Sequence, residues 1–159
     1  MNKPLVNIRR ALSTDTDSLV SLLEELFAIE EDFIFDGERQ RRELELMLAS
    51  PLSCVLTAET ENGVIGMCSG QLTISTAEGS ASLLVEDVIV TEDWRGKIVG
   101  RQLLDSIAQW AAEQGVTRMQ LLADRSNKAG LDFYTRYVWQ QTRLICLRKR
   151  QKTKTPQFD

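Results

Sequence analysis

The chain has 159 residues, a net charge of −4 and a pI near 5.0, values that argue against nucleic acid as its main partner. Hydrophobic residues make up 43% and charged residues 26% of the sequence, which is typical of a globular protein rather than a disordered or fibrous one. The sequence contains no histidine, which excludes Ser-His-Asp and Cys-His catalysis and argues against zinc. We therefore expect no metal.

Three features bear on compartment and domain organisation. Cys54, Cys68 and Cys146 are isolated and lack metal-ligand spacing, so we expect buried, reduced thiols. No apolar run approaches the roughly 20 residues that a membrane span needs, and no secretory signal pattern is present, which indicates a cytoplasmic protein without a membrane partner. The pattern predicts one domain over residues 1–149 and a mobile, basic tail over residues 150–159.

The first third of the chain predicts a strand followed by two helices. The strand covers residues 5–10, and the first helix begins at a cap over residues 14–17 and ends near Glu30. Its apolar residues recur at i, i+3, i+4, i+7 and i+8, as on a packed helical face: Leu19, Leu22, Leu23, Leu26 and Phe27. The second helix begins at Gly37 and ends before Pro51.

The remaining segments predict a sheet interrupted by helices. Asn62-Gly63 is a tight-turn signal, so the strands on either side of it are expected to be antiparallel neighbours. The predicted elements are strands over 53–59 and 64–75, a turn over 76–79, a strand over 82–90, a helix closed by Gly115, a strand over 118–123, a helix over 128–137 and a strand over 141–149. The order β-α-α-β-β-β-α-β-α-β predicts an α/β (α+β) fold with a mixed, mostly antiparallel sheet and four flanking helices.

The segment from Glu86 to Gly100 joins a strand to a helix through a short basic turn. The backbone N–H groups of a helix's first turn have no intrahelical partner, and the helix dipole favours negative charge there. Arg95 and Lys97 add positive charge at the same point. The segment therefore predicts a phosphate-binding turn.

Arg95-Gly96-Lys97-Ile98-Val99-Gly100 resembles the Arg/Gln-x-x-Gly-x-Gly/Ala loop of the GCN5-related N-acetyltransferase (GNAT) superfamily, which receives the pyrophosphate of acetyl-CoA. Two further motifs extend the resemblance to this superfamily over nearly the whole chain. Asn127-Lys128-Ala129 followed by Phe133-Tyr134 resembles the C-terminal signature. Glu86-Asp87-Val88-Ile89-Val90 looks like the segment of the diamine acetyltransferases that carries a base.

Two residues depart from the family's pattern. Ile98 stands where the family usually has its first glycine, so the loop is expected to lie farther from the phosphate or to expose fewer N–H groups. Val138 replaces the glycine before the final aromatic residue, Trp139. This replacement is expected to change the turn after the short helix.

The resemblance implies acetyl-CoA-dependent transfer of an acetyl group to a primary amine, by direct attack in a ternary complex. It implies Glu86 as the base, with an arginine ion pair as the alternative, and Tyr134 as the acid, with a core aromatic as the alternative. Strand alternation predicts that Asp87, the reserve base, lies on the opposite face from Glu86, whose pKa is expected to be raised. The implied coenzyme-binding residues are Val88, Ile89, Val90, Arg95, Gly96, Lys97, Ile98, Val99, Gly100, Arg101 and Asn127. Asn127 could instead cap a turn, and the two loop cations could simply be solvated.

The acceptor is the least specified part of the prediction. Acidic and aromatic residues between the first two helices predict a mouth for a small cationic amine, such as a polyamine, a diamine or an aminoglycoside. The predicted acceptor residues are Glu30, Glu31, Phe33 and Asp87, with Asp32, Phe35 and Asp36 nearby. The alternatives are a non-catalytic acetyl-CoA sensor or protein-interaction module, and a protein N-terminal or lysine acetyltransferase. The resemblance also implies a homodimer.

Overall fold

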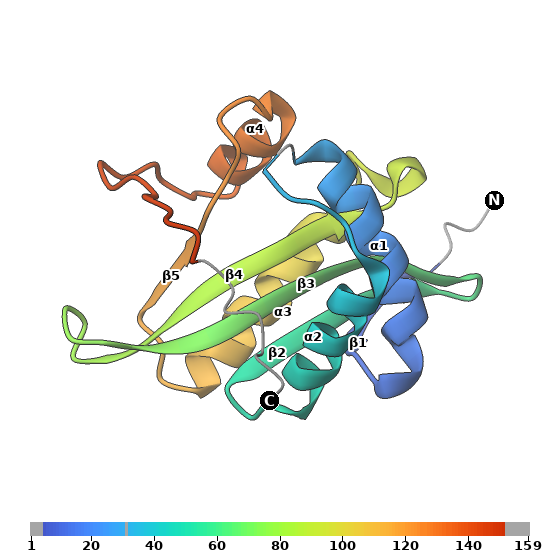
Figure 1. Ribbon diagram of the computed structural model, residues 1–159, viewed down its shortest axis with the longest axis horizontal. Coiled ribbons are helices and arrows are strands. Elements are labelled where there is room, and N and C mark those ends of the chain that lie inside the picture. The colour runs from blue at the N-terminus through green and yellow to red at the C-terminus, as the bar shows by residue number, and fades with distance from the viewer. Residues whose placement is uncertain (1–4, 31, 152–159) are drawn as a thin grey trace, which may run out of the picture. The chain divides into compact units, whose positions relative to one another are not determined.

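The computed structural model describes residues 5–30 and 32–151 (Figure 1). The chain divides into two compact units, over residues 1–124 and residues 125–159. One domain over residues 1–149 stays a prediction. Residues 152–159 of the predicted tail lie outside the described residues.

A mixed sheet in the order β1-β2-β3-β4-β5 forms the centre of the first unit. The strands are β1 (Asn7–Arg10), β2 (Ser53–Thr60), β3 (Gly63–Ser75), β4 (Ser80–Val90) and β5 (Arg118–Leu121). Neighbouring strands are antiparallel except β4 and β5, which are parallel. The predicted fold class is therefore confirmed. The β2–β3 hairpin closes with Thr60 opposite Gly63, as the turn signal predicts.

Helices cover both faces of the sheet in this unit. They are α1 (Thr16–Ile29), α2 (Gly37–Ala49) and α3 (Val99–Glu113), with short 3-10 turns η1 (Ser13–Asp15) and η2 (Glu92–Trp94). Figure 1 shows α1 and α2 in front of the sheet and α3 behind it. The α2 helix begins at Asp36, whose carboxylate accepts a 3.2 Å hydrogen bond from the Arg39 N–H. Asp36, near the predicted acceptor mouth, thus caps α2.

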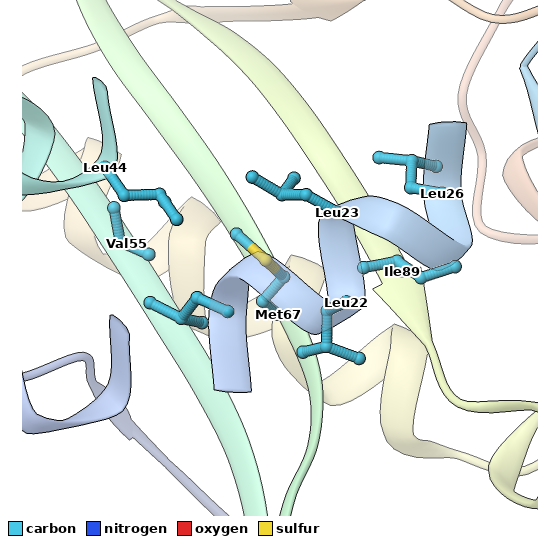
Figure 2. Packing of buried hydrophobic residues seen from close by; sticks show 8 residues of the cluster. Leu22, Leu23, Leu26, Leu44, Val55, Met67 and Ile89 are labelled. Carbon is cyan, nitrogen blue, oxygen red and sulfur yellow. The ribbon is translucent and has the colours of Figure 1, made fainter. Parts of the chain in front are cut away.

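The apolar stripe of α1 forms the core on the front face, as predicted. Leu22, Leu23 and Leu26 pack with Leu44 of α2 and with Val55, Met67 and Ile89 of the sheet (Figure 2). On the other face, a Cβ atom added at Gly70 of β3 would lie 2.9 Å from the Cδ1 atom of Ile107 on α3. A glycine there lets α3 approach the sheet closely, so β4 and the start of α3 are held against one rigid core.

The second unit contains α4 (Lys128–Arg136) and the segment that follows it. The strand predicted over residues 141–149 is wrong, because the described residues after α4 form no strand. Leu144, Ile145 and Leu147 are exposed there, and Cys146 is also exposed rather than buried as expected. A strand-like composition reports how well a segment fits a half-buried sheet surface, and residues 140–151 are all exposed.

The end of α4 corrects the expectation for Val138. The Val138 N–H bonds to Thr135 O and the Trp139 N–H to Tyr134 O, which is the pattern of a Schellman cap. Val138 has φ +69°, the conformation that glycine normally supplies at this position. The replacement therefore keeps the turn and places a β-branched residue in a strained conformation.

No helix among residues 5–30 and 32–151 is both long and apolar enough to span a bilayer.

Candidate active site

A β-bulge lies in the middle of β4. Met67 pairs with Ile89 and Ser69 with Glu86, so Asp87 and Val88 together face the single residue Cys68 on β3. Asp87 has φ +50°, in the left-handed region that aspartate tolerates better than most residues. The Ser69 hydroxyl donates a 2.9 Å hydrogen bond to its carboxylate.

The bulge changes which face the two acidic side chains occupy. Regular alternation would place Glu86 and Asp87 on opposite faces of the sheet, as the sequence predicted. Both line one groove instead, because the extra residue interrupts the alternation. That prediction is wrong, and its failure brings the two candidate bases to the same cavity.

The groove has a volume of about 430 Å³ and lies over the sheet beside α1 and α2. Its lining residues are Leu23, Phe27, Gln40, Glu43, Leu44, Leu46, Met47, Ser50, Ser53, Gln71, Glu86 and Asp87. All of its charged lining residues are acidic. The lining thus mixes apolar side chains with convergent polar and charged groups, a combination that suits a small-molecule site.

The pKa values of three carboxyl groups are raised in this region. Partial burial, reinforced by the charge of Asp87, raises the pKa of Glu86, in the direction that the sequence predicts. Burial raises the pKa of Asp87, while the Ser69 hydrogen bond opposes the rise. Burial raises the pKa of Glu30 at the end of α1, and the charges of Asp87, Asp124, Asp32 and Glu86 add to the effect.

The structure thus brings Glu30, Glu86 and Asp87 into one acidic region. Among the described residues no arginine forms an ion pair with Glu86. Phe33 is less directly placed: its ring lies 5.4 Å from the ring of Phe27, which lines the groove. Glu31 lies outside the described residues.

The loop between β4 and α3 has one left-handed residue, Gly96, with φ +70°. Ile98 has φ −66° and ψ −11°, an ordinary helical conformation, and its side chain is 58% exposed. The first hydrogen bond within α3 runs from Gln102 N–H to Ile98 O. The N–H groups of residues 99–101 precede it and are suited to a phosphate. The backbone therefore does not require glycine at position 98.

The loop cations have partners within the first unit. Arg95 donates a 2.9 Å hydrogen bond from Nε to Val90 O, and its guanidinium lies 3.5 Å from the carboxylate of Glu25 on α1. The Lys97 ammonium lies 4.4 Å from the centre of the Trp94 ring, a cation–π contact. Arg101 pairs with Asp105 one helical turn later at 3.3 Å. These contacts fix the loop against α1 and along α3.

The C-terminal part of β4 extends beyond β5, its parallel neighbour. The β4–β5 pairing ends at Val85 and Leu121, whereas β4 continues to Val90. Main-chain groups of residues 86–90 on that edge can therefore receive an extended amide chain as an added strand. Ile89 contributes its buried side chain to the core, so its role toward a ligand is limited to the main chain.

Asn127 and Tyr134 belong to the second unit. The Asn127 carboxamide oxygen accepts a 3.0 Å hydrogen bond from the Gly130 N–H and caps α4, which is the alternative that the sequence left open. The half-buried Tyr134 ring packs edge-on against Phe133 at 5.3 Å and Trp139 at 6.0 Å. The cap uses the Asn127 carboxamide oxygen and leaves its amide nitrogen as a donor for a ligand.

Sequence reasoning missed the α2 side of the groove. Gln40, Glu43, Met47 and Ser50 line it at spacings of three and four residues, which marks one helical face. A helix-face projection of α2 contained this signal. It was obscured because Glu43 lies among other charged residues that are simply solvated.

The first unit places helices on both faces of a sheet. The start of α3 is suited to a phosphate, and β4 extends beyond its pairing with β5. This combination is typical of a coenzyme-dependent transferase. Residues 18–138 match the model of the acetyltransferase (GNAT) family, and the chain belongs to this family. The predicted class, an acetyl-CoA-dependent N-acetyltransferase, is thereby confirmed. No match is found among curated proteins.

Solved structures share the fold at low sequence identity. A predicted acetyltransferase from Clostridium acetobutylicum, solved with acetyl-CoA, is 22% identical with a TM-score of 0.76, covering 91% of this chain and 96% of its own. An aminoglycoside acetyltransferase from an uncultured soil metagenomic sample, solved with trehalose, is 20% identical with a TM-score of 0.76 (92% and 97% covered). A ribosomal-protein-alanine N-acetyltransferase from Brucella melitensis biovar Abortus 2308 is 19% identical with a TM-score of 0.74 (93% and 100% covered).

Proposed function

We propose that the protein transfers the acetyl group of acetyl-CoA to a small, cationic primary amine, with Glu86 as the general base and Tyr134 as the general acid. The observation that carries the proposal is the position of Glu86. Its side chain lines the acidic groove, and its main chain lies where β4 has just left β5. A carboxylate there faces an amine in the groove and a coenzyme added along the strand edge.

The chemistry requires a neutral amine, because an ammonium group has no lone pair for attack. Alkyl ammonium groups have pKa values near 10.4, so a base must take one proton near neutral pH, directly or through water. The raised pKa of Glu86 makes it a stronger base than an ordinary carboxylate. Asp87 contributes its charge to this rise and remains the reserve base.

The transfer step is balanced by one proton donor and one acceptor. The amine nitrogen attacks the thioester carbonyl carbon, a C–N bond forms, and the C–S bond breaks. Before attack, Glu86 passes the proton that it took from the ammonium group to solvent. On attack it accepts the second proton from the nitrogen, while the Tyr134 hydroxyl gives a proton to the departing thiolate, whose conjugate acid has a pKa near 8.5. Return of the Glu86 proton to the Tyr134 phenolate through solvent restores both groups, with one proton released per turnover. Attack is direct, within a complex of enzyme, coenzyme and amine.

Separate parts of the chain are assigned to separate parts of the coenzyme. The main chain of Val88 to Val90 binds the pantetheine amides, and Asn127 adds a side-chain contact. The N–H groups from Arg95 to Arg101 bind the pyrophosphate. Support for the second assignment comes from the start of α3, where residues 99–101 precede the first intrahelical hydrogen bond.

The acidic groove favours a small cationic acceptor over a neutral one. The neighbouring carboxylates of Glu30 and Asp87 increase the negative potential there. Among the similar structures, one protein is described as an aminoglycoside acetyltransferase and another as acting on ribosomal-protein alanine. We assign a small cationic amine because the groove has a volume of about 430 Å³, in the range of small-molecule sites, and its charged lining residues are all acidic.

Thiol release from acetyl-CoA, followed with a panel of primary amines, tests the proposal. Glu86→Gln and Tyr134→Phe are expected to lower kcat by about 100-fold or more, the usual contribution of a positioned acid or base. Tyr137→Phe is the matched control for Tyr134, because its ring also packs on Phe133, at 4.9 Å. Coenzyme binding without turnover of any amine would instead support a sensor.

A further inference from the structure

We infer that the acceptor is a linear diamine whose second ammonium group is bound by Glu43 on α2. The inference rests on the proposed function and names the substrate class of the same groove. It begins with the two places from which acidic side chains enter the groove. Glu86 and Asp87 come from β4, whereas Glu43 comes from α2, which packs on β2.

The groove crosses the sheet between these two places. Ser53 on β2 and Gln71 on β3 line it and pair directly with each other, and Glu86 lies on the next strand. Adjacent strands are separated by about 4.8 Å, so β2 and β4, which both contribute to the groove, lie about 10 Å apart. An extended chain with a cation at each end fits such a span, whereas a compact amine reaches only one end.

Apolar side chains also line the groove. They are Leu23 and Phe27 of α1 and Leu44, Leu46 and Met47 of α2, beside the uncharged polar residues Gln40, Ser50, Ser53 and Gln71. Burial of methylene groups against the apolar side chains is favourable, whereas burial of an ammonium group there is unfavourable. The apolar part of the lining therefore suits an aliphatic stem, and the carboxylates suit its charged termini.

The charges of α2 are arranged by face. Glu43 lies on the groove-lining face, together with Gln40 and Met47. Arg39, Arg41 and Arg42 are absent from the lining, and Arg41 instead pairs with Asp17 at the start of α1. In a helix with this many arginines, a groove face whose charged residue is a glutamate favours a cation at that end.

Steady-state kinetics with matched amines tests the inference. Expected substrates are 1,4-diaminobutane and 1,5-diaminopentane, and the comparison substrates are n-butylamine and n-pentylamine, which lack the second cation. Wild-type protein is expected to show a kcat/KM at least about fivefold higher for the diamines, the size of a half-exposed ion pair. Glu43→Gln is expected to remove this preference by raising the diamine KM, with kcat unchanged.

Glu45→Gln is the matched control, because Glu45 is an exposed glutamate on the same helix outside the groove lining. It is expected to leave both KM values unchanged. Equal efficiency with diamines and monoamines, or an equal effect of both substitutions, would overturn the inference and leave the proposed function standing. Preference for kanamycin over every diamine would also overturn it. Failure to turn over any amine would overturn both.

Discussion

The Ser69 hydroxyl donates a 2.9 Å hydrogen bond to the Asp87 carboxylate across the β3–β4 pair. Ser69 is fully buried, and Asp87 occupies the left-handed conformation of the bulge. The bond thus holds the one residue that interrupts the alternation of β4. Because of that interruption, Asp87 and Glu86 line one groove rather than opposite faces of the sheet.

Ser69→Ala is expected to destabilise the fold by about 2 kcal/mol at neutral pH, the cost of losing a hydrogen bond to a charged group. The loss should depend on pH. Burial raises the pKa of Asp87, so the native state keeps its proton to higher pH than the unfolded state, and stability falls as pH rises through the raised pKa. In the Ser69→Ala variant the pKa of Asp87 rises further, because the hydrogen bond that lowers it is lost. Stability therefore falls by a larger amount as pH rises.

Denaturant unfolding from about pH 4 to about pH 8 measures this effect, since the interval begins near the ordinary pKa of aspartate. Ser82→Ala is the control: Ser82 is also buried on this strand pair, but its hydroxyl lies 2.7 Å from the neutral hydroxyl of Thr73. Its loss should be the same at both ends of the range. A pH-independent loss for Ser69→Ala would contradict the account.

Gly96→Ala tests the phosphate loop. Gly96 has φ +70° with no atom within 4 Å of an added Cβ, so the substitution acts through backbone strain of about 1–2 kcal/mol. We expect the KM for acetyl-CoA to rise about fivefold or more. Gly79→Ala carries the same strain at φ +65° in the β3–β4 turn and should leave that KM unchanged. Equal KM values for the two variants would argue against a coenzyme role for the loop.

Ile98→Gly separates the family pattern from the conformation of this loop. Because Ile98 has an ordinary helical φ and an exposed side chain, glycine relieves no strain there. We expect the Kd for acetyl-CoA, measured by calorimetry, to change by less than about twofold, which corresponds to about 0.4 kcal/mol of binding free energy. A large gain in affinity would show that the isoleucine side chain obstructs the coenzyme.

Asn127→Asp separates capping from coenzyme binding. Aspartate caps a helix as well as asparagine does, so the stability of α4 should be preserved, whereas the amide donor is lost. If the amide nitrogen donates to pantetheine, the KM for acetyl-CoA rises about threefold to tenfold, the value of one hydrogen bond. Asn127→Ala should lose both the cap and the contact. An unchanged KM for Asn127→Asp would assign the residue to capping alone.

Val138→Gly is expected to stabilise the protein by about 1 kcal/mol. The residue is 82% exposed and has φ +69°, so little apolar burial is lost while the left-handed strain is removed. Thermal unfolding of the two proteins provides the measurement. A lower melting temperature for the glycine variant would show that the turn is not strained in solution.

The helices and the antiparallel strands could be predicted because their signals are local. The stripe from Leu19 to Leu26 and the Asn62-Gly63 turn each identify an element within a few residues. The bulge at Asp87 could not be predicted in this way, because it depends on how β3 and β4 pair. The strand predicted over residues 141–149 failed for a related reason: its residues are strand-like, but the structure keeps them exposed.

The residues of the candidate site also fall into two groups, those identified by a local motif and those that depend on the folded structure. Glu86 and the loop from Arg95 to Gly100 were identified from the sequence because a family motif names them at fixed spacing. Glu43 was not, because an acidic residue on an exposed helix becomes informative only when the facing groove is known. The ion pair between Arg95 and Glu25 could not be predicted from the sequence either, because it joins residues that are distant in the chain.

The most direct test of the central claim is amine-dependent thiol release by wild-type protein and by Glu86→Gln, together with acetyl-CoA affinity measured by calorimetry. The account predicts that wild-type protein turns over at least one small cationic amine. It predicts that Glu86→Gln loses about 100-fold or more in kcat while acetyl-CoA binds equally well. Equal kcat values for the two proteins would contradict the assignment of Glu86 as the base.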